Sequence, residues 1–144
     1  LGATHAHNPV DSDLSALVLE LTGGMMADYV FVATGAPAAL RQAEALVGTM
    51  GAIVIVGMPA AGVDGTFDPG ALAGRNQRIL GSKMGTSVIA RDIPLLVAKY
   101  HDGALELDDL VSQTFPLDGI NEAMDGVRSG AALRNVIVFE REQT

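Results

Sequence analysis

Two basic residues and two glycine-containing turns are the parts of this 144-residue sequence that could bind a charged ligand. Lys83 lies within the glycine-flanked stretch Gly81–Gly85, and Arg134 directly precedes a possible strand over 135–139. Their cationic groups could pair with a phosphate or a carboxylate, and an ordinary surface role fits either residue equally well. The turns are Ala33-Thr34-Gly35 and Val56-Gly57-Met58, where glycine could let the backbone approach a ligand closely.

Bond-making chemistry has little support in this sequence. His5 and His7 alternate along a possible short strand and could hold a metal, but no third ligand is placed with them, so packed or exposed histidines are favoured. The sequence lacks the G-x-S-x-G, H-E-x-x-H and Walker motifs. Because there is no cysteine, disulfides and thiolate zinc sites are excluded. We therefore expect no catalytic residue and no metal ligand.

Residues 27–58 contain the clearest structural pattern, and it positions both turns. Tyr29–Ala33 and Ala52–Val56 are apolar runs of strand length, as in parallel strands that are buried on both faces. Between them, Leu40, Ala43 and Leu46 recur at helical spacing. The pattern predicts a strand, a helix and a second parallel strand, with neither strand exposing a face to water. Ligands bind at the carboxyl ends of such strands, which is where the two turns lie.

The remaining elements are shorter and flank this unit. Before the unit, we expect a weak strand over 3–7 and a helix from Asp11 or Ser12 to Gly23. After it, we expect extended chain at Thr66-Phe67-Asp68, a helical turn over 70–73 and a strand over 76–82. The last part should contain a helix from Asp92 to Gly103, a short helix over 105–110, a helix that Asp118 caps and Gly130 ends, and a strand over 135–139.

Composition limits the partners. Hydrophobic residues make up 49% of the chain, which suits one compact domain. The formal charge of −8, without a lysine- or arginine-rich run, argues against nucleic acid or an anionic membrane as partner. No apolar stretch reaches the roughly 18 residues of a membrane span. We expect a cytoplasmic protein.

A dinucleotide-binding sheet needs a G-x-G-x-x-G turn after its first strand, and this sequence has none. Either the ligand is not a dinucleotide or the chain begins after that motif.

The order of segments nevertheless resembles the carboxyl-terminal part of the zinc-containing medium-chain alcohol dehydrogenases. The segments are LGATHAHNP, ELTGGMMADYVFVATGAPAALRQAEALV, MGAIVIVGMP, TFDPGALAGRN, ILGSKMGT and FPLDGINEAMDGVRSGAALRNVIVF. The resemblance covers essentially the whole chain. It implies an α/β fold: a Rossmann-like parallel sheet with flanking helices, lacking the first two strands of the doubly wound domain.

The resemblance also implies roles for individual residues. Ala33, Thr34 and Gly35 would border the adenosine of NAD or NADP, and Val56, Gly57 and Met58 would line the nicotinamide ribose, so that a side chain at position 57 would weaken binding while the fold survives. Backbone groups of Val56, Ser82 and Met84 would contact the carboxamide, with Lys83 beside them. Arg134 would lie near the pyrophosphate, and Thr66-Phe67-Asp68 would pair two subunits. Residues 131–140 would form a closing strand that joins a catalytic domain.

The family's zinc ligands, proton relay and glycine fingerprint would all lie before Leu1. The leading hypothesis is therefore the cofactor-binding portion of a zinc-dependent NAD(P) alcohol dehydrogenase, acting on a small alcohol or aldehyde, with this chain alone inactive. The alternative is a non-catalytic Rossmann-like module for binding or dimerisation.

Overall fold

The computed structural model describes residues 2–139, which divide into two compact units, residues 2–87 and residues 88–139. The sequence indicates one domain and no boundary at residue 87. No helix within the described range combines the length and the apolar character that crossing a membrane requires.

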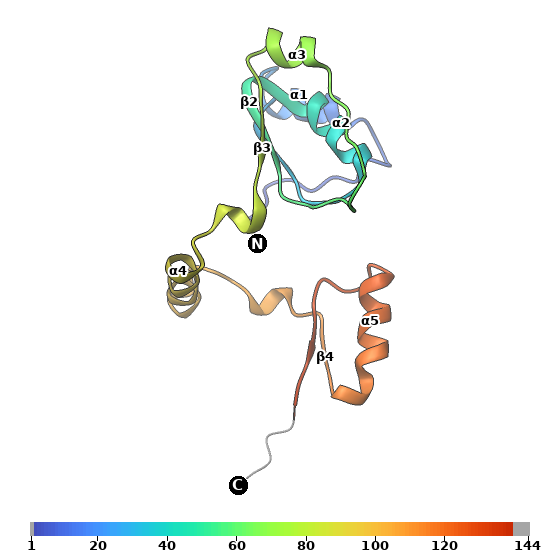
Figure 1. Cartoon of the computed structure of the whole chain (residues 1–144), viewed down its shortest axis with the longest axis vertical. Helices are drawn as coiled ribbons and strands as arrows, with labels where there is room; N and C mark the ends of the chain where they lie inside the picture. Colours follow the sequence, from blue (N-terminus) through green and yellow to red (C-terminus); the bar gives the residue numbers. More distant parts are fainter. Residues whose placement is uncertain (1, 140–144) are drawn as a thin grey trace. The chain divides into compact units, whose positions relative to one another are not determined.

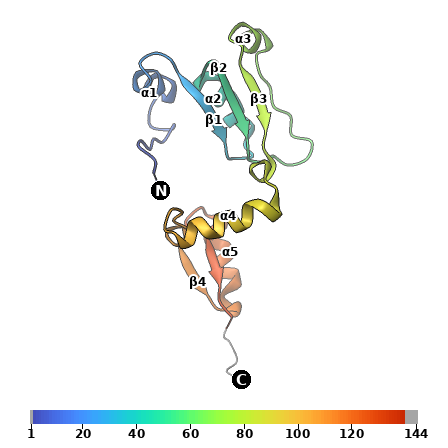
Figure 2. The ribbon, with the colours of Figure 1, turned by 90° about the vertical axis from the view of Figure 1, so that its left-hand side faces the viewer.

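Residues 2–87 form a parallel sheet with the strand order β1-β2-β3, and Figure 2 shows the three strands side by side. The strands are β1 (Ala27–Val32), β2 (Val47–Ile55) and β3 (Arg78–Gly81). The helices are α1 (Leu14–Leu21), α2 (Pro37–Leu46) and α3 (Pro69–Gly74), followed by the 3-10 turn η1 (Lys83–Thr86). The predicted strand-helix-strand unit is confirmed, and the expected helical turn and later strand are α3 and β3 (Figure 1).

The core lies between α2 and one face of the sheet. Val32, Ala43, Val47 and Ile53 are buried together, with exposures of 7%, 2%, 0% and 1%. Half-buried Val30, Leu40, Ile55 and Ile79 pack around them. Ala43 and Leu46 are the buried residues of α2, so the helical spacing correctly predicted which stripe of this helix faces the sheet.

On the opposite face of the sheet β1 is exposed, which contradicts the prediction that this strand has no face in water, whereas Ala52 of β2, in register with Tyr29, is buried. Tyr29 and Phe31 of β1 are 57% and 65% exposed, and their rings stack on each other at a centroid distance of 6.4 Å. Successive side chains of a strand point to opposite faces, and α2 packs on the face of Val30 and Val32. Apolar composition alone does not supply a covering layer for the second face.

The expected strand over residues 3–7 is also absent. In the familiar sheet order that segment pairs with a strand that residues 2–139 do not contain, and a strand without a partner leaves its backbone groups unpaired. Asp13 caps α1 by accepting hydrogen bonds from the amides of Ser15 and Ala16, one or two residues later than we predicted.

Residues 88–139 begin with α4 (Ile89–His101), one turn before the predicted start at Asp92. The amide of Val88 donates to Asp92 Oδ2 at 2.7 Å, and Arg91 Nε donates to Asp92 Oδ1 at 2.6 Å. These hydrogen bonds lower the pKa of Asp92, and the hydrogen bond from Arg91 has the larger effect. Asp92 therefore stabilises the helix start from within its first turn rather than preceding it, which leaves Pro94 inside the helix.

The second unit continues with η2 (Asp108–Leu110), β4 (Gln113–Phe115), η3 (Leu117–Gly119), α5 (Ile120–Arg128) and β5 (Asn135–Ile137). β4 and β5 pair in parallel, and β4 was not predicted. Asp118 lies in η3 and does not cap α5, whose N-cap is Gly119. The expected closing strand over 131–140 corresponds to the shorter β5, and residue 140 lies outside the described residues.

Candidate functional site: three turns at one edge of the sheet

Three turns that follow β1, β2 and β3 lie side by side at the carboxyl edge of the sheet. The carbonyl of Val32 accepts from the amides of Val56 and Gly57 at 3.0 and 2.8 Å, which fixes the first turn against the second. The amide of Ser82 donates to the carbonyl of Ile55 at 2.9 Å, which fixes the third turn to the end of β2. Nine of the ten predicted cofactor residues belong to these turns, namely Ala33, Thr34, Gly35, Val56, Gly57, Met58, Ser82, Lys83 and Met84.

The glycines of the first two turns allow neighbouring backbone segments to pack closely. A Cβ on Gly57 would lie 2.5 Å from the backbone N, C and O atoms of Thr34. A Cβ on Gly35 would lie 2.8 Å from the carbonyl oxygen of Met58 and 3.1 Å from Cα of Pro59. A side chain at position 57 would therefore collide with the neighbouring turn, a cost to the fold that the sequence-based expectation for this position did not include.

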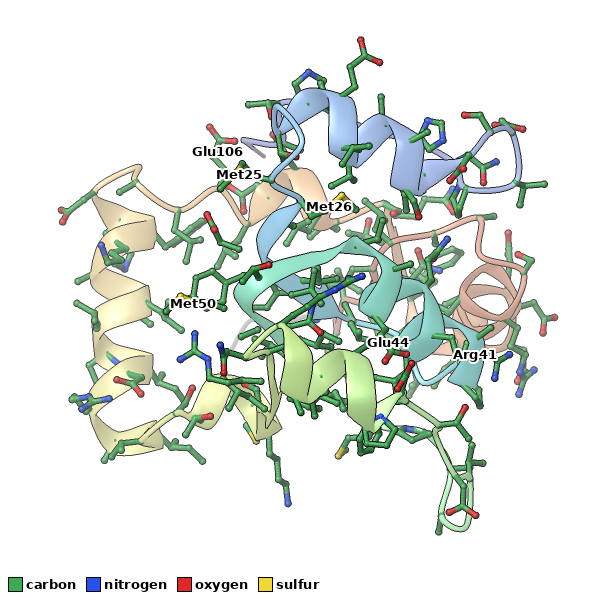
Figure 3. The ribbon with its side chains drawn as sticks, turned by 90° about the horizontal axis from the view of Figure 1, so that it is seen from above. Met25, Met26, Arg41, Glu44, Met50 and Glu106 are labelled. Carbon is green, nitrogen blue, oxygen red and sulfur yellow. The ribbon has the colours of Figure 1, made fainter. Side chains whose placement is uncertain are left out.

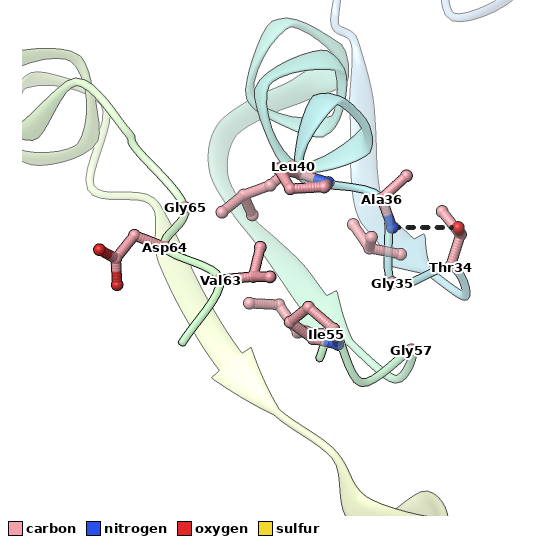
Figure 4. Close-up of a pocket in the computed structure, with 12 residues that line it drawn as sticks. Thr34, Gly35, Ala36, Leu40, Ile55, Gly57, Val63, Asp64 and Gly65 are labelled. Carbon is pink, nitrogen blue, oxygen red and sulfur yellow. Dashed lines mark hydrogen bonds between the residues drawn. The ribbon is translucent and has the colours of Figure 1, made fainter. Parts of the chain in front are cut away.

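The first hollow at this edge, the α2 hollow, has a volume of about 150 Å³ and is drawn in Figure 4. Leu40, Ile55 and Val63 give it apolar walls from α2, from β2 and from the loop before α3. Three of the predicted residues, Thr34, Gly35 and Gly57, also line it. Thr34 Oγ1 accepts from the amide of Ala36 at 3.2 Å, which fixes the turn that leads into α2.

The second hollow, the β3 hollow, lies between the turns after β2 and β3 and measures about 480 Å³. Five predicted residues line it, namely Val56, Gly57, Met58, Ser82 and Lys83. Ile55, Pro59, Gly81 and Thr86 complete the wall. Lys83 is the single charged side chain in this wall, and Ser82 and Thr86 contribute the two hydroxyls.

Two further predicted residues of the same unit, Ala33 and Met84, line neither hollow. Ala33 lines a groove along β1 and α2. Met84 is 68% exposed and has a φ of 50° within η1. Arg134 belongs to residues 88–139, where its carbonyl accepts from the amide of Ser112 at 2.7 Å. Its assignment to the same site stays a prediction.

Sequence reasoning missed Leu40, Pro59, Val63 and Thr86 as wall residues. Leu40 was assigned to the core stripe of the helix, Pro59 and Val63 lie in a loop without periodicity, and Thr86 ends the short 3-10 turn η1. These residues reach the hollows only through the tertiary fold, and no local sequence pattern predicts that placement.

Thr66-Phe67-Asp68, the predicted pairing segment, is not a strand in the single chain. The amide of Asp68 donates to Glu44 Oε1 at 2.7 Å, and Glu44 projects from α2 beside Arg41 in Figure 3. Asp68 Oδ1 accepts from the amides of Gly70 and Ala71 and so caps α3.

Among residues 2–139, no group of three or more histidine, cysteine, aspartate or glutamate side chains could hold a metal ion. His5 Nδ1 is 3.0 Å from Thr4 Oγ1, and His7 Nε2 is 2.9 Å from Ser12 Oγ. The described residues therefore do not fit a zinc ion. Apolar walls with a few polar groups at the carboxyl edge do fit an organic cofactor.

A parallel sheet with a covering helix and hollows at its carboxyl edge defines a Rossmann-like α/β protein. Comparison with protein families matches residues 1–100 to the zinc-binding dehydrogenase model. The chain is 32% identical to an alcohol dehydrogenase class-3 from Cereibacter sphaeroides, over 96% of this chain and 39% of that protein.

Among solved structures, benzyl alcohol dehydrogenase from Acinetobacter calcoaceticus matches with a TM-score of 0.90 and 32% identity, over 96% of this chain and 38% of the other. A Burkholderia ambifaria alcohol dehydrogenase zinc-binding domain protein matches with a TM-score of 0.89 and 35% identity, over 97% and 37%. The chain belongs to the zinc-binding dehydrogenase family, which confirms the resemblance and the fold class inferred from the sequence. It spans 39% of the length of the curated relatives it matches.

Proposed function

We propose that this chain is the cofactor-positioning part of a zinc-dependent NAD(P) alcohol dehydrogenase that acts on a small alcohol or aldehyde. The observation that carries the proposal is the meeting of three strand-end turns beside two hollows, in a chain of the zinc-binding dehydrogenase family. A bound nicotinamide supplies hydride acceptance or donation, and the protein supplies binding and orientation. The zinc ligands of the whole enzyme would lie outside residues 2–139.

Each turn has its own part in this proposal. Thr34 and Gly35, at the α2 hollow, would hold the adenosine side of the cofactor. Val56, Met58 and Ser82, at the β3 hollow, would hold the nicotinamide side, with the apolar walls excluding water. Gly57 lines both hollows, and its turn contacts Thr34. This contact would fix the distance between the hollow for the adenosine side and the hollow for the nicotinamide side.

Fluorescence titration of the purified chain with NADH and NADPH tests this function. We expect saturable binding of at least one reduced cofactor and no alcohol oxidation when zinc, oxidised cofactor and small alcohols are supplied, because the described residues offer no metal-ligand set. Absence of binding to the folded chain would contradict the cofactor assignment. Zinc-dependent turnover by the chain alone would contradict its assignment as a positioning part.

We further infer that Thr66 and Phe67 pair with the same segment of a second copy. No described residue makes a backbone hydrogen bond to Thr66 or Phe67, and Phe67 is 48% exposed. Asp68 is less available, because its amide already bonds Glu44. Extended backbone with free donors and acceptors is what strand pairing across a two-fold axis requires.

Replacing Phe67 by proline removes one amide donor from this segment and should convert a dimer to a monomer, measured as mass by light scattering. Phe67→Ala is the matched control, because it removes the ring and keeps the amide. Circular dichroism must show both variants folded. A dimer mass retained by folded Phe67→Pro would refute pairing through this segment.

The alternative function, a binding or dimerisation module without catalysis, predicts self-association without affinity for nicotinamide cofactors. The same titration separates the two candidates.

A further inference from the structure

The chain on either side of residues 66–67 contacts α2 at two points. After them, the amide of Asp68 donates to Glu44 Oε1 at 2.7 Å, a contact between residues 24 positions apart in the sequence. Before them, Gly65 lies so close to α2 that a Cβ there would be 2.5 Å from Leu40 Cδ2. Figure 4 shows the side chain of Leu40 directed toward Gly65. Two side chains of one helix therefore contact both ends of this segment.

The spacing of these contacts restricts the segment between them. Leu40 and Glu44 are four residues apart in α2, so their side chains lie on the same side of the helix, one turn apart. Only two residues separate Gly65 from Asp68. Contacts at both ends of so short a segment reduce the number of backbone conformations that residues 66–67 can adopt.

The carboxylate of Glu44 has a single hydrogen-bond partner among residues 2–139, the amide of Asp68. Arg41 lies beside Glu44 in Figure 3, but the ion pairs within the described range are confined to residues 88–139. A hydrogen bond from an amide to a carboxylate is stronger than one between neutral groups. The interaction of Glu44 is therefore with the backbone next to Phe67 and not with a neighbouring cation.

We propose that Glu44 is a positioning residue for self-association: its carboxylate holds the Asp68 amide, so that Thr66 and Phe67 meet a second copy of the chain in a fixed conformation. The inference rests on the proposed pairing of these two residues and adds the side chain that prepares them for it. A loop that is already held in its bound conformation loses less entropy on association. A dimer with two-fold symmetry contains the Glu44 contact twice, so its loss counts twice.

Analytical ultracentrifugation of the 144-residue chain over a concentration series measures the dissociation constant of the dimer. Glu44→Met and Glu44→Ala remove the oxygen acceptor and keep good helix formers in α2. Each should raise the constant about tenfold, which is about 1.4 kcal/mol for the two contacts of one dimer. Glu44→Gln should raise it by about threefold at most, because its side-chain oxygen still accepts from the amide, without the charge.

A matched control and a second measurement separate positioning from general damage to the fold. Gln42→Ala is the control, since Gln42 is exposed on the same helix, and its dimer should dissociate as that of the unaltered chain does. Exchange of the Asp68 amide proton, followed by NMR on dilute monomer, should be faster in Glu44→Met than in Glu44→Gln. Circular dichroism must show each variant folded.

The outcomes distinguish this inference from the proposals on which it rests. If folded Glu44→Met and Glu44→Ala dimerise as tightly as the unaltered chain while Phe67→Pro is monomeric, this inference fails and the pairing proposal stands. A loss in Glu44→Gln as large as that in Glu44→Met would also overturn it, because the acceptor oxygen is then irrelevant. If the unaltered chain is a monomer, or Phe67→Pro dimerises normally, the pairing proposal and this inference fail together. Absence of NADH binding would contradict the cofactor assignment alone.

Discussion

Replacing Gly57 by alanine is expected to lower the free energy of unfolding by about 1–3 kcal/mol, the usual cost of forcing extra atoms into a packed site. The added methyl group would lie 2.5 Å from the backbone N, C and O atoms of Thr34. Backbone atoms cannot rotate away as a side chain can, so the turns after β1 and β2 must separate. Thermal or urea denaturation followed by circular dichroism measures the loss.

Gly81→Ala is the matched control for this experiment. Gly81 ends β3 at the same edge of the sheet, and a Cβ there meets no atom within 4 Å. Its free energy of unfolding should stay within about 0.5 kcal/mol of the unaltered value, as for substitutions away from packed features. If Gly57→Ala melts at the same temperature as Gly81→Ala, the close contact between the two turns does not exist in solution.

The result also determines how cofactor binding by position-57 variants should be interpreted. A Gly57 variant that loses affinity for NADH could lose it because the two turns move apart, without any contact between Gly57 and the cofactor. Gly81 borders the β3 hollow and has space for a side chain, so Gly81→Ala tests contact with the cofactor more directly. Weaker NADH binding by a fully stable Gly81→Ala chain would support the assignment of the nicotinamide side to this hollow.

The parts of the fold that the sequence predicted correctly are those with strong periodicity. Ala43 and Leu46 define the buried stripe of α2, and the runs around Val32 and Ile53 define two paired strands. Parallel strands place their carboxyl ends at one edge, so the meeting of the turns at Thr34, Gly57 and Ser82 could also be predicted.

Other features depend on contacts that no local pattern records. The start of α4 was misplaced because Asp92 accepts from the amide of Val88, four residues earlier, rather than preceding the helix. Asp68 was assigned to a pairing strand, whereas its carboxylate caps α3 and its amide bonds Glu44, 24 residues away. The close packing of Gly57 against Thr34 was not predicted, because the two residues are distant in sequence.

The burial of the sheet is the largest difference between expectation and structure, and two substitutions measure it. Ile53 is 1% exposed within the core, so Ile53→Ala should cost about 2–5 kcal/mol by creating a cavity under α2. Phe31 is 65% exposed on the other face, so Phe31→Ala should cost less than about 1 kcal/mol although a larger side chain is removed.

Urea denaturation of both variants gives the two free energies of unfolding under one set of conditions. The comparison is informative because Phe31 and Ile53 occupy neighbouring strands of one sheet and differ in the face they occupy. A cost for Phe31→Ala as large as that for Ile53→Ala would show that the face of Tyr29 and Phe31 is covered in solution. A concentration-dependent cost would then identify the cover as a second copy of the chain, since dissociation and unfolding are coupled in that case.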